Sequence, residues 1–189
     1  MASLSAMHAA SSLFFTLFDT AVGGCALVWG EHGLVGVLLP EPSDAATRRR
    51  ARRRYPGVQE TAPTLALDPV IARIQALLNG GRDDLEDIAL DLSAIPAFHR
   101  RVYEVARRIH PGHTRSYGEI AHELGEPQAA RAVGQALGAN PFPIIVPCHR
   151  VLAAGAKAGG FSAPGGTRTK LRLLEIEGAP LGGTPGLFD

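Results

Sequence analysis

The chain changes its residue pattern near Ile95-Pro96, and this change restricts it to a fold of two parts. Before that point, short apolar runs are separated by glycine pairs, which is typical of a small antiparallel meander. After it, apolar residues recur at helical spacing. The 189 residues suffice for two small domains. We therefore predict an α+β protein, with a loose tail over 1–12, a small antiparallel-sheet domain over 13–95, a mainly helical domain over 96–180 and a second tail over 181–189.

Composition and charge exclude several classes of protein. With 46% hydrophobic and 20% charged residues, the chain is neither disordered nor fibrous. No run of about 18 uncharged apolar residues predicts a membrane span, and the first 15 residues lack the positive charge of a secretory signal. Only Cys25 and Cys148 are present, too few for a disulfide framework, so a cytoplasmic protein is expected. From Phe98 onward, 11 Lys and Arg residues oppose 7 Asp and Glu residues, which hints at a polyanionic partner.

The N-terminal part contains no catalytic constellation. Cys25 and His32 are too few for a zinc site, so both are interpreted as structural, and no metal is expected. The arginine run from Arg48 to Arg54 is interpreted as a solvated helix face, with attraction to phosphate as the alternative. The predicted elements are strands over 15–20, 26–29, 34–39 and 88–92, and helices over 43–55 and 69–78.

Two short helices in the second part form a candidate helix-turn-helix, after an amphipathic helix that begins near Phe98. Ser116 and Glu119 have the spacing of a capping box, which predicts a helix up to Leu124. Pro127 is expected to begin the next helix and Gly138 to lie just past its end.

The outer face of that second helix carries one charge among small and polar residues. Arg131 is the charge, and this composition suits a close approach to a nucleic-acid groove; packing against another domain is the alternative. The outer face comprises Gln128, Arg131, Ala132 and Gln135, and the inner stripe comprises Ala130, Val133, Gly134 and Leu137.

The segment from Asn140 to Val151 carries the most specific chemistry. Three prolines flank a predicted buried strand over 144–146 and place Cys148 on a restricted backbone. A cysteine beside a histidine suggests a thiolate nucleophile and its base. Adjacent side chains diverge, however, so His149 needs a bridging water or a turn to reach the thiol.

A carboxylate from the last predicted helix, over 169–176, would complete a Cys-His-Glu set. Glu175 and Glu177 both lie near the end of that helix, where an acid opposes the helix dipole, and Gly178 ends it. The pattern leaves the choice between the two open, and an ordinary surface glutamate is the alternative.

The string Pro147-Cys148-His149-Arg150-Val151 follows Asn140-Pro141 and Arg131-Ala132-Val133-Gly134. With the helix-turn-helix before it, this arrangement resembles the O6-alkylguanine-DNA alkyltransferases. The resemblance implies a ribonuclease H-like N-terminal domain and a helix-turn-helix in the C-terminal domain. It implies that Cys148 accepts the alkyl group, that His149 is its water-bridged base and that Asn140 is a hinge. Glu177, directly before Gly178, is preferred to Glu175 as the carboxylate that orients His149.

The same resemblance implies the DNA contacts and the guanine pocket. Tyr117 would rotate the target nucleotide and touch the guanine, and Arg131 would replace the extruded base in the stack. Phe161 stands where the family often has tyrosine, and residues 163–166 lengthen the following loop. The implied DNA-binding residues are Tyr117, Gln128, Ala129, Ala130 and Arg131, and the implied pocket residues are Tyr117, Val151, Gly159, Phe161 and Ser162.

The implied function is DNA repair by a monomer. It would flip O6-alkylguanine out of double-stranded DNA through the minor groove, and the sequence leaves open whether O4-alkylthymine is a further substrate. The alkyl group would pass irreversibly to Cys148, once per chain, without cofactor or metal. Three alternatives stay open: a cysteine hydrolase, a DNA-binding regulator in which Cys148 is inert, and an alkyltransferase-like sensor, a class that usually replaces the cysteine.

Overall fold

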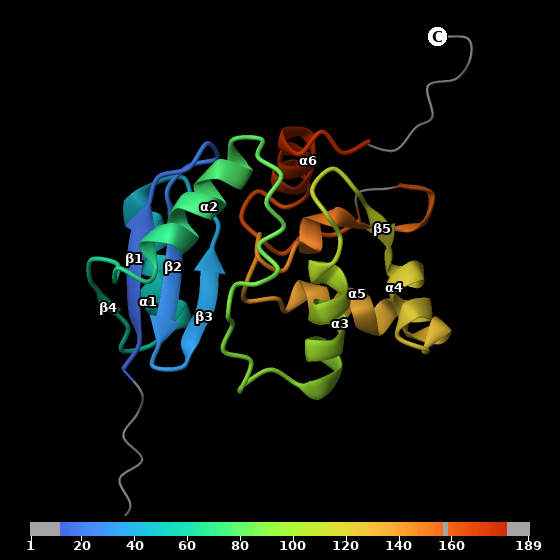
Figure 1. The fold of residues 1–189 in the computed structure, drawn as a ribbon, viewed down its shortest axis with the longest axis horizontal. Coiled ribbons are helices and arrows are strands. Elements are labelled where there is room, and N and C mark those ends of the chain that lie inside the picture. The colour runs from blue at the N-terminus through green and yellow to red at the C-terminus, as the bar shows by residue number, and fades with distance from the viewer. Residues whose placement is uncertain (1–11, 157–158, 181–189) are drawn as a thin grey trace, which may run out of the picture.

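The computed structural model describes residues 12–156 and 159–180, so nearly all of both predicted tails lies outside the described residues. Three strands form an antiparallel meander: β1 (Phe14–Phe18), β2 (Cys25–Gly30) and β3 (Gly33–Leu38). Figure 1 shows them side by side at one end of the molecule. The antiparallel meander predicted from the glycine-punctuated runs is therefore confirmed.

The fourth strand of the sheet, β4, lies outside every predicted strand, and the strand predicted over 88–92 is wrong. β4 (Gln59–Glu60) pairs parallel with β1, which gives the sheet the order β3-β2-β1-β4. Its two residues are polar and exposed, so they carry no apolar alternation from which a strand could be predicted. The alternating segment over 88–92 pairs with the sheet at one position only, an isolated bridge between Leu34 and Leu90, so it forms no regular strand.

Two helices cover opposite faces of the sheet, as Figure 1 shows. They are α1 (Asp44–Arg54) and α2 (Asp68–Leu78), and Ser43 caps α1 by accepting from the Ala46 amide. β2 is buried on both sides, so its alternate residues belong to two apolar clusters. Ala26 and Val28 pack with Ala51 of α1, whereas the cluster on the other face contains Leu27 of β2 together with Ile74 and Leu77 of α2.

The second part is mainly helical, and its capping box is confirmed. The Glu119 amide donates to Ser116 Oγ at 3.1 Å, and the Ser116 amide donates to Glu119 Oε2 at 2.6 Å. Two boundaries of the second helix are wrong by short distances: Pro127–Ala129 form a 3₁₀ turn before the helix, and Gly138 is its last residue. The elements are α3 (Ala97–Arg107), β5 (Arg115–Ser116), α4 (Tyr117–Glu123), α5 (Ala130–Gly138), 3₁₀ turns at Cys148–Arg150 and Ala154–Ala156, β6 (Val151–Leu152), which is parallel to β5, and α6 (Thr167–Ile176).

The strand predicted over 144–146 is also wrong: these residues form a turn, in which Ile144 has a φ of 78°. The hydrogen bonds close a local loop instead of a ladder. The Val146 amide donates to the Phe142 carbonyl at 2.8 Å, and Asn140 Nδ2 donates to the Val146 carbonyl at 2.9 Å. The loop delivers the chain directly into the 3₁₀ turn that begins at Cys148.

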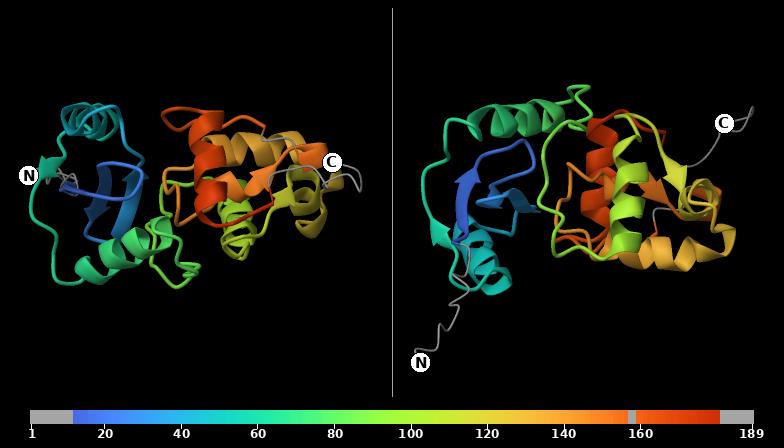
Figure 2. Two further views of the ribbon diagram at one scale, coloured as in Figure 1. Left: turned by 90° about the horizontal axis from the view of Figure 1, so that it is seen from above. Right: turned by 60° about the horizontal axis from the view of Figure 1, so that its bottom comes forward.

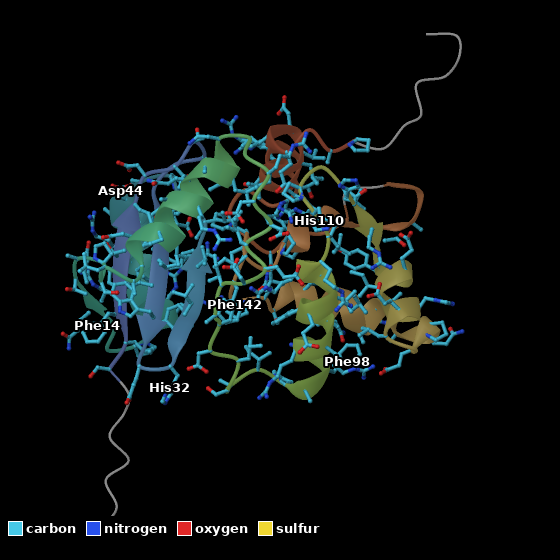
Figure 3. All side chains as sticks on the ribbon, viewed as in Figure 1. Phe14, His32, Asp44, Phe98, His110 and Phe142 are labelled. Carbon is cyan, nitrogen blue, oxygen red and sulfur yellow. The ribbon has the colours of Figure 1, made fainter. Side chains whose placement is uncertain are left out.

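The two parts meet along β3. The Val37 amide donates to the Pro141 carbonyl at 2.8 Å. Phe142 is fully buried and lies between β3 and α3 in Figure 3. The left view of Figure 2 places α1 and α5 along the same side of the molecule. Among the described residues, no helix has the length and apolar character needed to cross a membrane.

Candidate active site

Cys148 begins a buried 3₁₀ turn behind the Asn140 loop, and its side chain reaches a cavity. Burial raises the pKa of the Cys148 thiol, because the charged thiolate loses its hydration. Hydrogen bonding from the Asn140 side chain and the positive charge of Lys170 act in the opposite direction. The thiol is thus protonated at rest and needs a base, while the site already holds groups that favour the thiolate.

His149 lies against Glu177 and not against Glu175. His149 Nε2 is 2.9 Å from Glu177 Oε1, and the two residues are only 1% and 5% exposed. Glu175 is exposed and lines a shallow hollow on the outer surface of α6. The carboxylate fixes the proton of His149 on Nε2, which leaves Nδ1 as the proton acceptor. Nδ1 is buried and has no hydrogen-bond partner among the described residues.

Arg150 completes a buried charged cluster that the sequence analysis did not find. Its Nε and Nη2 donate to the two oxygens of Glu177 at 2.9 and 2.8 Å, and its Nη1 donates to the Ile109 carbonyl. Burial acts to raise the pKa of Glu177, but the bonds from His149 and Arg150 outweigh it and hold this pKa at about 2. Burial also lowers the pKa of His149, so the imidazole is neutral and ready to accept a proton.

Lys170 is a second buried cation that the sequence analysis missed. Its Nζ donates to the Val151 carbonyl at 2.6 Å and lies 5.9 Å from the centre of the Tyr117 ring. Burial lowers the pKa of Lys170 to about 8, and attraction to Cys148 acts against this shift. One signal was available in the sequence: Lys170 precedes Leu173 and Leu174 by three and four residues, so it falls on the apolar stripe of α6.

A cavity of about 560 Å³ opens beside Cys148 between α4, α5 and the loop after Gly159. Of the predicted pocket residues, Tyr117, Phe161 and Ser162 line it. Val151 is fully buried, and Gly159 packs behind the ring of Tyr117, so neither contributes to the wall. The lining residues are Tyr117, Ala130, Arg131, Gly134, Leu137, Gly138, Cys148, Gly160, Phe161 and Ser162.

Some of the predicted DNA-binding residues line this cavity, and the others lie outside it on the preceding turn. Ala130 and Arg131 line the cavity from the first turn of α5. Gln128 and Ala129 lie on the preceding 3₁₀ turn, outside the lining. Tyr117 begins α4, and burial, with a smaller effect of Cys148, raises the pKa of its hydroxyl, which therefore stays protonated and can donate.

The arrangement suits a thiolate reaction on a largely apolar group that enters the cavity. The cavity walls are largely apolar side chains and glycines. The Cys148 thiol and the Tyr117 and Ser162 side chains line the cavity, and His149, the neighbour of Cys148 in the sequence, supplies a buried base. Within residues 12–156 and 159–180, no three His, Cys, Asp or Glu side chains form a group that could hold a metal ion.

Comparisons with known proteins agree with this site. Residues 97–179 match the family model described as 6-O-methylguanine DNA methyltransferase, DNA binding domain. A methylated-DNA–protein-cysteine methyltransferase of Methanothermobacter thermautotrophicus is 33% identical over 83% of this chain and 81% of its own length. A DNA base-flipping protein of Thermus thermophilus is 41% identical over 77% of this chain and 95% of its own. The structure of Mycobacterium tuberculosis OGT in complex with DNA is 33% identical, with a TM-score of 0.71 over 88% of this chain and 95% of that one. On these matches, the chain is a member of the methylated-DNA–protein-cysteine methyltransferase family.

Proposed function

We propose that this chain repairs DNA by transferring the alkyl group of O6-alkylguanine to Cys148. The observation that carries the proposal is Cys148 at the wall of a cavity of about 560 Å³, followed by a His149 whose Nε2 is held by Glu177. A hydrolase would need a second step to free Cys148, and a thioether offers none, so each chain reacts once.

The proposed reaction begins when His149 Nδ1 takes the thiol proton, directly or through a water molecule. Glu177 stabilises the charge that His149 gains, because its carboxylate is 2.9 Å from the opposite nitrogen. The thiolate then attacks the alkyl carbon: the Sγ–C bond forms, the C–O6 bond breaks, and the electron pair leaves with the guanine. Tyr117 gives the departing ring a proton and regains one from the protonated His149 through solvent, so both residues return to their starting protonation states. The net change moves the alkyl group from O6 to Sγ and one proton from Sγ to guanine.

The proposed DNA-binding unit is α4, the Gly125 turn and α5, acting as a helix-turn-helix in the minor groove of double-stranded DNA. Small residues at the start of α5, Ala129 and Ala130, permit a close approach, and Asn140 ties the end of α5 to the active-site loop through its bond to Val146. Because an alkylated base inside the stack is out of reach of Cys148, the base must be flipped.

We also infer the organisation of the whole chain. The β3-β2-β1-β4 order, with β4 parallel to β1, supports a ribonuclease H-like domain over 13–95, followed by the alkyltransferase domain over 96–180. We propose that the protein acts as a monomer. Both cysteines are buried and unpaired, which suits the reducing cytoplasm.

Mixing the protein with duplex DNA that contains O6-methylguanine is expected to raise its intact mass by one methyl group, about 14 Da. The added mass should map to the peptide that holds Cys148 and should stop at one methyl per chain. Cys148→Ser is expected to bind the DNA and gain no mass, because a serine hydroxyl is not ionised here. Release of methyl without an adduct would indicate a hydrolase, and binding without an adduct would indicate a base-flipping sensor.

Arg131→Ala is expected to slow the reaction with duplex DNA at least 10-fold more than the reaction with free O6-benzylguanine. Arg131 is exposed at the cavity entrance and is proposed to support the flipped state, which a free base does not require. The measurement is the single-turnover rate on both substrates, with Arg168→Ala on α6, an exposed arginine outside the proposed DNA-binding unit, as the control. Equal losses on the two substrates would contradict the proposed role of Arg131.

A further inference from the structure

The arginine run of α1 carries more positive charge than the acidic side chains of the described residues neutralise. Arg48 and Arg52 share Glu60, at 2.7 and 3.3 Å, and Arg50 pairs with Glu41 at 3.3 Å. Among the described residues, no carboxylate lies within ion-pair distance of Arg49, Arg53 or Arg54. The acidic residues in α1 or in ion pairs with it are Glu41, Asp44 and Glu60.

Two arginines of α1, Arg50 and Arg54, reach the active site. Arg50 and Arg54 are four residues apart, so they lie on one face of α1. Both line a small cavity of about 80 Å³ that Cys148 and Asn140 also line. This cavity and the larger one share Gly138, Cys148, Phe161 and Ser162 as wall residues, so the arginines border the proposed base pocket from a cavity that Tyr117 does not line. The left view of Figure 2 shows α1 and α5 on the same side of the molecule.

The charge around Arg50 favours an anion. Burial lowers the pKa of Arg50, and the positive charges of Arg54 and Arg53 lower it further. The carboxylate of Glu41 acts in the opposite direction and raises it. A negatively charged group near Arg50 and Arg54 would relieve this repulsion. The anion that the proposed function brings to this place is DNA phosphate, because a nucleotide that rotates into the pocket carries its two flanking phosphates to the rim.

We propose that Arg50 and Arg54 of α1 bind phosphates of the strand that carries the flipped nucleotide, so that the N-terminal part is a second DNA-contacting element. The inference rests on the proposed function, since it takes the base pocket as its reference point. Arg48 and Arg52, held by Glu60 on the far side of α1, take no part in this contact.

The test is the salt dependence of duplex binding by Arg50→Gln/Arg54→Gln. Each phosphate contact contributes about −0.9 to the slope of log K against log salt concentration, so losing two should make the slope shallower by roughly 1.8. Arg48→Gln/Arg52→Gln is the matched control: it makes the same charge change at the same spacing on the same helix, and its slope should equal that of the wild type. The single variant Arg54→Gln, which removes no internal ion pair, should lose about half as much, roughly 0.9.

A second measurement separates phosphate binding from damage to the pocket. Single-turnover rates on methylated duplex and on free O6-benzylguanine should show a duplex-to-free-base ratio that falls about 10-fold in Arg50→Gln/Arg54→Gln and stays constant in the control. An unchanged slope in both the double and single variants, or equal changes in the variant and the control, would overturn the inference. Because the slope comes from binding alone, it decides the inference even if no methyl group is transferred and the proposed function fails.

Discussion

Arg150→Met is expected to lower the free energy of unfolding by about 3–5 kcal/mol, the usual cost of removing one partner of a buried ion pair. Arg150 is fully buried and donates to both oxygens of Glu177, so methionine fills part of the volume but leaves a buried carboxylate without its cation. The measurement is urea unfolding at pH 7, analysed by the linear extrapolation method.

The matched control is Arg101→Met, because the Arg101–Glu126 pair has a similar separation, 2.7 Å, but is exposed. That change should cost less than about 1 kcal/mol. Similar losses in the two variants would contradict the assignment of Arg150 as the cation that holds Glu177 in the core.

The same variant should show an altered dependence of stability on pH. In the wild type, the pKa of Glu177 lies near 2, below its unfolded value, so its contribution is complete above about pH 5 and is lost as the pH falls toward 2. In Arg150→Met the pKa of Glu177 should rise, because burial is then opposed by His149 alone and no longer by Arg150 as well. The carboxylate stabilises that variant less than the wild type at pH 7, so the difference between the two proteins should shrink as the pH falls from about 5 toward 2, where the carboxyl becomes protonated in both.

The elements with strong local signals were predictable from the sequence. Ser116 and Glu119 form their capping box by contacts three residues apart, and Gly178, with a φ of 67°, ends the last helix as expected. The meander was predictable because glycine pairs mark its turns. His149 and Glu177 lie 28 residues apart, and only the family resemblance chose between Glu177 and Glu175, a choice that agrees with the observed contact.

The errors fall where tertiary contacts override a local pattern. The apolar run over 144–146 has strand composition, yet the Asn140 side chain binds both ends of a turn and leaves no partner for a ladder. Arg150 and Lys170 resemble surface cations in the sequence, and their burial depends on Glu177 and on the Val151 carbonyl, which belong to other elements. A one-dimensional pattern does not specify such partners, so the charged interior of the site is visible only in the fold.

Glu177→Gln is expected to slow methyl transfer at pH 7 by about two orders of magnitude or more, the range typical of a lost proton-transfer aid. Without the carboxylate, the charge that His149 gains on taking the thiol proton lies beside Arg150 with no anion to stabilise it. The imidazole becomes a weaker base, and the thiol, whose pKa burial already raises, ionises less often. Part of the lost rate should return as the pH rises, because the bulk solvent can then remove the thiol proton.

Glu175→Gln is the matched control for this prediction. It makes the same substitution two residues away on an exposed side chain, and it should leave the rate within about twofold while slightly relieving the helix dipole. The measurement is the single-turnover rate between pH 6 and 9, expressed as the ratio of variant to wild type. The ratio cancels the titration of Lys170, whose pKa of about 8 falls in the same interval. A pH-independent ratio for Glu177→Gln would mean that the carboxylate supports only the fold, and a slow Glu175→Gln would require a different partner for His149.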